Sequence, residues 1–162
     1  MGPADHPVRR SIRLRGFDYS MPGGYFVTIC ARSGTHPFAM IVKGKLRATS
    51  LGAQALAVWK STPEHFPLVV LDAHCLMPNH FHGIVWIYDG PPVMRPRLGV
   101  IIRAFKAEVT RHARQGGWED GALWHRNYYE SVIRDRRHLD AVRRYIANNP
   151  RAWESTHRSP RA

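Results

Sequence analysis

Residues 68–87 read LVVLDAHCLMPNHFHGIVWI and contain two runs of strand-forming residues separated by a short turn. The β-branched and aromatic residues of 68–75 and 80–87 predict two strands, and Met77-Pro78-Asn79 predicts the turn between them. Strands joined by so short a connection pair antiparallel. We therefore expect an antiparallel sheet built around this hairpin.

The sequence on either side of the hairpin predicts further strands and three helices. Strands are expected over 25–31 and 124–134, and a small hairpin over 39–48 with its turn at Lys43-Gly44. Helices are expected from residue 49 or 50 to about residue 65, over 98–114 and over 136–148, where Pro150 is expected to end the last helix. This order predicts an α+β fold of the ferredoxin-like (RRM-like) kind, an antiparallel sheet with helices packed on it.

Length and charge limit the organisation and the partners. The chain has 162 residues, which suits one domain over 24–150 between a basic N-terminal arm (1–23) and a basic tail (151–162). Lys and Arg total 24 against 12 acidic residues, a formal charge of +12. Such an excess favours a polyanionic partner, usually nucleic acid, although an Arg-rich composition also fits a GC-rich genome. The arm fits either a solvated tail or a segment that touches a nucleic-acid backbone.

Several functional classes are not expected. Cys30 and Cys75 are the only cysteines, too few for a disulfide framework or a zinc ribbon. No apolar run approaches the ~18 residues of a membrane span, and no signal peptide is apparent. No phosphate-binding P-loop motif is present, so we expect no nucleotide cofactor. The default location is the cytoplasm.

His80-Phe81-His82 lies directly after the predicted turn. Because strand side chains alternate between faces, His80 and His82 share one face and form a candidate pair of metal ligands. A chance occurrence is the alternative, since the chain has 10 histidines. A zinc cluster that adds His74 and Cys75 is a further alternative.

The last predicted helix carries Tyr145 and Asn149 at a spacing of four residues. This spacing places a phenol and an amide on one helix face. The alternative is structural: Tyr145 would pack in the core beside Leu139 and Val142, and Asn149 would cap the end of the helix before Pro150.

Taken together, these segments resemble a known family. The YFVTIC strand at 25–30, the MPNHFHGIV block at 77–85, the WHRNYYESVIRD block at 124–135 and RRYIANNP at 143–150 resemble the REP-associated tyrosine transposases, members of the HUH superfamily of single-tyrosine transposases. The similarity covers roughly residues 10–152 in register. It identifies 24–150 as an HUH transposase domain with the catalytic tyrosine on the last helix.

The resemblance implies a reaction and a role for each site residue. Tyr145 would be the nucleophile, and His80, His82 and Asn149 would bind Mg²⁺ or Mn²⁺. The implied activity is nicking and rejoining of single-stranded or hairpin DNA through a 5′-phosphotyrosine intermediate, in a bacterial, nucleoid-associated protein. The resemblance favours a monomer over a domain-swapped homodimer. The alternative function is a non-catalytic DNA- or RNA-binding module with the same fold.

Basic residues near these motifs are candidate DNA contacts. They are Arg13, Arg103, Lys106, Arg111, Arg126, Arg143 and Arg144. Other polar residues leave two readings open: Glu130 and Asp135 as extra ligands, or Asp135 as a helix cap. Tyr128 and Tyr129 are expected on opposite faces, one in the core and one able to stack on a base.

Overall fold

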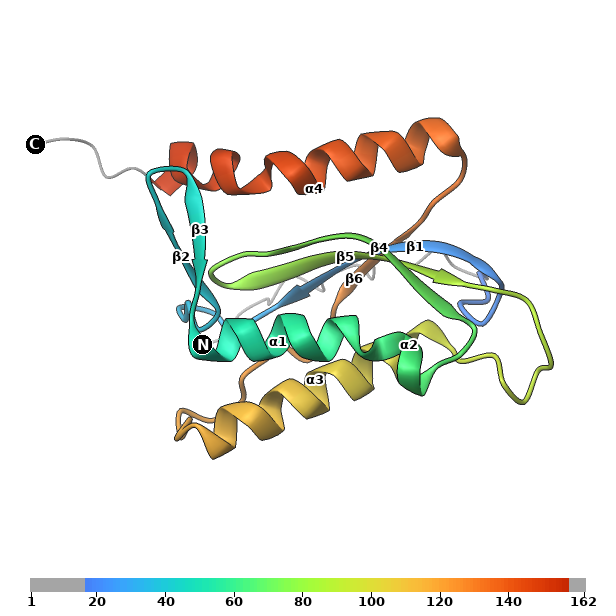
Figure 1. The fold of residues 1–162 in the computed structure, drawn as a ribbon, viewed down its shortest axis with the longest axis horizontal. Coiled ribbons are helices and arrows are strands. Elements are labelled where there is room, and N and C mark those ends of the chain that lie inside the picture. The colour runs from blue at the N-terminus through green and yellow to red at the C-terminus, as the bar shows by residue number, and fades with distance from the viewer. Residues whose placement is uncertain (1–16, 158–162) are drawn as a thin grey trace, which may run out of the picture.

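The central element is a four-stranded antiparallel sheet in the order β4-β5-β1-β6 (Figure 1). The computed structural model describes residues 17–157, so Arg13 and most of the predicted arm lie outside the described part. The strands are β1 (Gly23–Cys30), β4 (Val69–Leu76), β5 (His80–Ile87) and β6 (Tyr129–Val132). The hairpin of β4 and β5 expected from the sequence is confirmed.

Helices cover both faces of this sheet. On one face lie α1 (Ser50–Lys60), the short α2 (Thr62–His65) and α3 (Leu98–Gln115), and on the other lies α4 (Arg136–His157) (Figure 1). The order β1-α1-β4-β5-α3-β6 confirms the α+β, ferredoxin-like prediction. The fourth helix adds a layer on the face that the other helices leave open.

Turn and capping residues act locally as the sequence indicates. In the hairpin of β2 (Ala39–Val42) and β3 (Lys45–Ala48), Lys43 and Gly44 have φ angles of 51° and 70°, as a tight hairpin turn requires. Thr49 caps α1 by accepting a hydrogen bond from the backbone N–H of Gly52 at 3.0 Å. The helix expected to reach residue 65 is divided at Ser61 into α1 and α2.

Two boundaries predicted from the sequence are wrong. The strand expected over 124–134 is regular only in β6, with one isolated bridge between Ala31 and Trp124 before it. The last helix does not end at Pro150 but continues to residue 157. A proline inside a helix removes one backbone hydrogen bond. The continued turn brings the Trp153 ring to 5.8 Å from the His36 ring and 5.9 Å from the His80 ring, contacts that a helix ending at 148 would lack.

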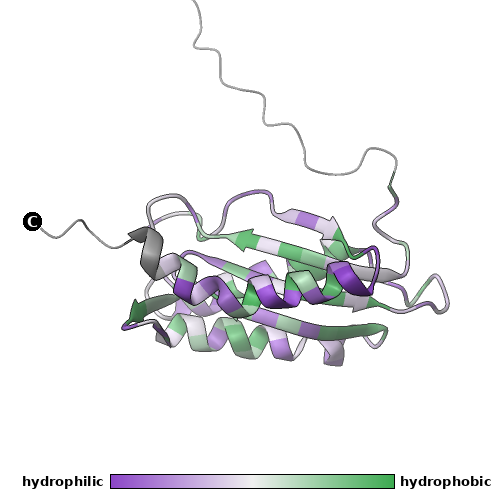
Figure 2. Cartoon of the chain, turned by 90° about the horizontal axis from the view of Figure 1, so that it is seen from above, coloured by the Kyte–Doolittle hydropathy of each residue, from purple (hydrophilic) through white to green (hydrophobic). Residues whose placement is uncertain are grey.

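The two faces of the sheet bury separate apolar clusters. Under α1 and α3 lies the larger one, which includes Tyr25, Trp59, Phe81 and Phe105. Under α4 lies a smaller one, formed by Ile84, Ile133, Leu139, Val142 and Ile146. Seen from above, α4 presents mainly hydrophilic residues outward (Figure 2). No helix in the described range 17–157 is long and apolar enough to cross a membrane.

Gly83 is required where β5 passes over Trp59. A Cβ at this position would lie 2.5 Å from the buried Trp59 ring. We expect Gly83→Ala to destabilise the protein by about 1–3 kcal/mol because the overpacked strand must shift. Gly99→Ala is the control, since its Cβ would meet only the Tyr128 hydroxyl at 3.6 Å. Urea unfolding measures both, and equal stability of the two variants would contradict the argument.

Candidate active site

The alternation of β5 places His80 and His82 on one face of the sheet, as predicted, and this face is the one that α4 covers. Phe81 between them belongs to the cluster under α1 and α3. The Nε2 atoms of the two imidazoles face each other at 3.0 Å. The His-x-His pattern therefore produces a converging pair of nitrogens.

The outer nitrogen of each imidazole has a hydrogen-bond partner. Asn79 Oδ1 lies 2.7 Å from His80 Nδ1 and accepts a hydrogen bond from its N–H, and Thr28 Oγ1 lies 2.9 Å from His82 Nδ1. When Nδ1 of each ring donates, both Nε2 lone pairs point into the shared space. Sequence reasoning missed both partners. Asn79 precedes His80 in the MPNHFH block, but Thr28 is found only through the pairing of β1 with β5.

Burial keeps both imidazoles neutral near pH 7. It lowers the pKa of His80 to about 4, against a smaller opposing effect of the hydrogen bond with Asn149. Burial, together with a smaller effect of the neighbouring His80, lowers the pKa of His82 to about 3. Neutral imidazole is the form that binds metal ions.

Helix α4 brings three side chains over this pair at successive spacings of four residues. The Tyr145 ring lies 5.4 Å from the His82 ring, and Asn149 Nδ2 lies 3.3 Å from His82 Nε2. Trp153 follows beside His80. Tyr145 and Asn149 thus share one helix face, as their spacing predicted, and they meet the histidines, as the resemblance implied. Trp153 was missed because the helix was expected to end before it.

The structural alternatives for Tyr145 and Asn149 are wrong. Tyr145 is 54% exposed rather than packed in the core, although its ring approaches Phe26 at 6.0 Å. Asn149 is buried in the middle of α4, so it is not a terminal cap. An exposed phenol and a buried amide therefore lie on the histidine side of the helix.

Asp72 ties α4 to the sheet. The guanidinium of Arg143 donates to both carboxylate oxygens, at 3.0 and 2.7 Å, and Trp86 Nε1 donates to Oδ2 at 3.2 Å. Asp72 lies at an irregularity of β4, between Leu71 and His74. Because Arg143 is two residues before Tyr145, this pair fixes the helix close to the tyrosine.

The other proposed ligands lie elsewhere. His74 pairs in register with Gly83 and stacks on Phe81, so it faces α1 and α3. Glu130 pairs with Val27, whose side chain is in that same cluster. Asp135 accepts a hydrogen bond from the backbone N–H of His138, which confirms the capping interpretation. Within residues 17–157 no three His, Cys, Asp or Glu side chains form a metal cluster, so the zinc alternative with Cys75 fails.

The candidate DNA-binding cations fall into two groups. Some are engaged within the protein: Lys106 Nζ donates to the carbonyl of His125 at 2.8 Å, Arg111 pairs with Glu108, and Arg143 pairs with Asp72. The side chains of Arg103, Arg126 and Arg144 are exposed. Helix α3, with Arg103, Lys106 and Arg111, lies on the face opposite the histidines (Figure 1). The sequence did not anticipate this separation.

Two proteins of one bacterium are similar to this chain over most of its length. An uncharacterised protein of Haemophilus influenzae is 37% identical in an alignment of 163 positions that covers 90% of each sequence. A second protein of that organism, named "Putative REP-associated tyrosine transposase", is 24% identical over 82% of this chain and 73% of its own. No protein-family model matches.

A solved structure of a REP-associated tyrosine transposase bound to a REP hairpin has the same fold, with a TM-score of 0.60 and 18% identity. The match covers 82% of this chain and 68% of that one. The motifs, the relative that is 24% identical and the shared fold all support the REP-associated tyrosine transposase family as the one that this chain resembles. Its similarity to these proteins supports a transposase-type function.

The ion pair between Asp72 and Arg143 predicts a pH-dependent stability. The hydrogen bonds from Arg143 lower the pKa of Asp72, so the stabilisation is complete above the ordinary value of 3.8 and is lost as the pH falls through the lowered value. We expect Asp72→Asn to cost roughly 1–2 kcal/mol at neutral pH and progressively less in acid. Urea unfolding between about pH 6 and pH 2 measures the difference.

Asp89→Asn is the matched control, because Asp89 pairs with Arg95 in an exposed loop away from α4. It should change stability little. A cost of Asp72→Asn that stays constant down to pH 2 would contradict the electrostatic origin.

Proposed function

We propose that the protein is a metal-dependent endonuclease and strand transferase that nicks and rejoins single-stranded DNA beside hairpins, with Tyr145 as the nucleophile. The observation that carries the proposal is the position of Tyr145 and Asn149 over the His80 and His82 pair. This arrangement supports the HUH single-tyrosine assignment. A transesterification of this kind needs no nucleotide cofactor.

The donor set fits a divalent ion. The two neutral imidazoles converge through Nε2, and the Asn149 amide lies beside them with an oxygen that a rotation of its terminal torsion would present. These three residues would hold Mg²⁺ or Mn²⁺ and leave positions for phosphate oxygens and water. When bound, the ion would neutralise negative charge that develops on the phosphate.

The exposure of Tyr145 suits covalent attack on DNA. Its phenolic oxygen forms the bond to phosphorus while the bond to the 3′ oxygen breaks, which yields a 5′-phosphotyrosine and a free 3′-OH. Solvent can accept the phenolic proton, because the side chain is 54% exposed. Rejoining reverses the step and preserves the phosphoester energy.

The proposed substrate is single-stranded or hairpin DNA. The similar solved structure is bound to a REP hairpin, and this chain carries a formal charge of +12. We assign phosphate contacts first to the exposed Arg126 and Arg144 and to Arg103 on the other face. Arg13 remains a candidate, whereas Lys106, Arg111 and Arg143 would act mainly through the protein contacts described above. Action on a bacterial genome implies a cytoplasmic, nucleoid-associated protein.

The proposed site is complete within one chain. The helix that carries Tyr145 packs on its own sheet through Ile84, Val142 and Ile146. This favours a monomer over a homodimer that exchanges the helix.

The nucleophile is tested by trapping the covalent adduct. With Mg²⁺ or Mn²⁺ and labelled single-stranded hairpins from the neighbourhood of the gene, the wild-type protein should form a DNA adduct that survives denaturing electrophoresis. Tyr145→Phe should abolish the adduct yet bind the hairpin within about twofold of wild type, because only the attacking oxygen is removed.

Tyr88→Phe is the matched control, since Tyr88 is 56% exposed against 54% for Tyr145. It should form the adduct normally. An adduct with Tyr145→Phe would contradict the assignment of the nucleophile. Tight hairpin binding by the wild type without cleavage in either metal would instead support the non-catalytic binding module.

Thr28 tests whether the orientation of His82 matters for metal binding. Thr28→Val keeps the shape but loses the hydroxyl 2.9 Å from His82 Nδ1. We expect Mn²⁺ affinity to fall about 10–100-fold, as with other outer partners of ligating histidines. Titration calorimetry with Mn²⁺ measures the loss, with Thr35→Val as control, because Thr35 bonds only the Arg32 carbonyl. Unchanged affinity for Thr28→Val would contradict this role.

A further inference from the structure

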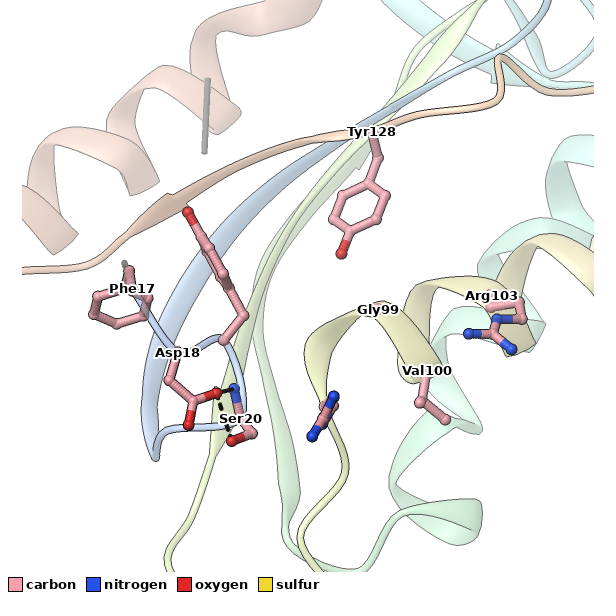
Figure 3. A pocket seen from close by; sticks show the side chains of 9 residues that line it. Phe17, Asp18, Ser20, Gly99, Val100, Arg103 and Tyr128 are labelled. Atoms are coloured by element: carbon pink, nitrogen blue, oxygen red, sulfur yellow. Dashed lines mark hydrogen bonds between the residues drawn. The ribbon is translucent and has the colours of Figure 1, made fainter. Parts of the chain in front are cut away.

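A second recess lies at the start of α3, away from α4. This pocket of about 250 Å³ is bounded by the segment before β1, the residue before β6 and the first turns of α3 (Figure 3). Pockets for drug-sized ligands usually span ~300–1,000 Å³, so this one suits a smaller group such as one nucleobase. It shares no residue with the candidate active site.

One side of the pocket is aromatic. Tyr19 and Tyr128 line it, and Phe17 packs edge-on against Tyr19 with ring centroids 5.0 Å apart. Gly99 lies opposite Tyr128 (Figure 3), and the absence of its side chain leaves that space open. Aromatic walls of this kind offer stacking surfaces for bases.

The other side of the pocket is basic. Arg97 and Arg103 line it from α3 and the residue preceding it. Within the described part of the chain, the Arg103 guanidinium has no ion-pair partner, in contrast to Arg111 on the same helix, which pairs with Glu108. An exposed guanidinium beside an aromatic pocket is suited to a phosphate group.

A single carboxylate makes one end of the pocket negatively charged. Asp18 accepts hydrogen bonds from the backbone N–H and the hydroxyl of Ser20, at 2.9 and 2.6 Å. These bonds lower its pKa, helped by the charges of Arg97 and Arg95, so it is ionised at neutral pH. A phosphate beside Asp18 would be repelled, which leaves the Arg103 end for the phosphate.

We propose that this pocket binds one nucleotide of an unpaired DNA strand, with the base between Tyr19 and Tyr128 and its phosphate at Arg103. The proposal rests on the proposed function only in taking single-stranded DNA as the substrate. The pocket would be a second DNA-binding site, on the face of the sheet opposite Tyr145. A DNA strand bound in it would stay attached to the protein whether or not it is cut.

The test is binding of a fluorescein-labelled 12-nucleotide single strand of mixed sequence to the full chain in EDTA, read by fluorescence anisotropy. Gly99→Leu fills the pocket without removing a charge and should weaken binding about fivefold or more. Gly116→Leu is the matched control, because Gly116 follows the other end of α3 outside the pocket and its Cβ would meet only carbonyl oxygens at 3.5 Å; it should bind as wild type. Wild-type affinity of Gly99→Leu would overturn the proposal.

The charge at the pocket is tested by salt dependence. Arg103→Ala should reduce the slope of log K against log salt by about 0.7, the value for one phosphate contact on a single strand. Lys60→Ala removes an exposed cation at the end of α1 and should leave the slope unchanged. Equal slopes for the two variants would overturn the phosphate assignment.

A crosslink keeps the proposal testable if Gly99→Leu fails to fold. A 12-mer carrying 4-thiothymidine should crosslink on irradiation to the peptide containing Tyr19 or Tyr128. Crosslinks confined to β5 and α4 would overturn the proposal. Because EDTA prevents metal-dependent cleavage, none of these results depends on adduct formation, so failure of the pocket and failure of the nucleophile assignment are distinguishable.

Discussion

The alternation of side chains along β5 sets the geometry on which the candidate site depends. Phe81 and Val85 enter the core under α1 and α3, and this burial fixes the register of the strand. His80 and His82 are thereby held on the opposite face, with their Nε2 atoms 3.0 Å apart. A slip of one residue would bury the imidazoles in the apolar core. The position of the histidines is therefore stabilised by apolar contacts that take no part in any chemistry.

The second half of the site depends on how α4 docks. The apolar cluster beneath it is small, and its residues are shared between the helix and the centre of the sheet. The bidentate contact between Arg143 and Asp72 adds a directional restraint close to Tyr145. An apolar stripe alone permits a helix to rotate or slide by small amounts, whereas two parallel hydrogen bonds do not. The positions of Tyr145 and Asn149 thus depend on an ion pair of which the motif at 143–150 contains only Arg143, because Asp72 lies on β4.

The parts of the molecule that sequence reasoning could predict are those fixed by local periodicity. The shared face of His80 and His82 and the spacing of Tyr145 and Asn149 follow from strand and helix geometry alone. The continuation of α4 through Pro150 could not be predicted, because local propensity opposes it and tertiary contacts such as those of Trp153 favour it. Thr28 and Asp72 were missed for the same reason: each reaches its partner only after the sheet and α4 have assembled.

The positive charge of the chain is distributed over two faces of the sheet once the helices are placed. A total of +12 suggests one polyanion-binding surface, yet α3 and α4 cover opposite faces of the sheet (Figure 1). Several cations are paired with carboxylates within the protein, as Arg143 is with Asp72. These cations stabilise the fold and are less available to a polyanion. The remaining exposed ones, including Arg103 and Arg144, lie on different faces. A long DNA substrate would gain affinity from both, because a contact on one face raises the effective concentration of the strand at the other. Under the proposed function, retention of the cut strand and the position of the cut would then be controlled by separate surfaces.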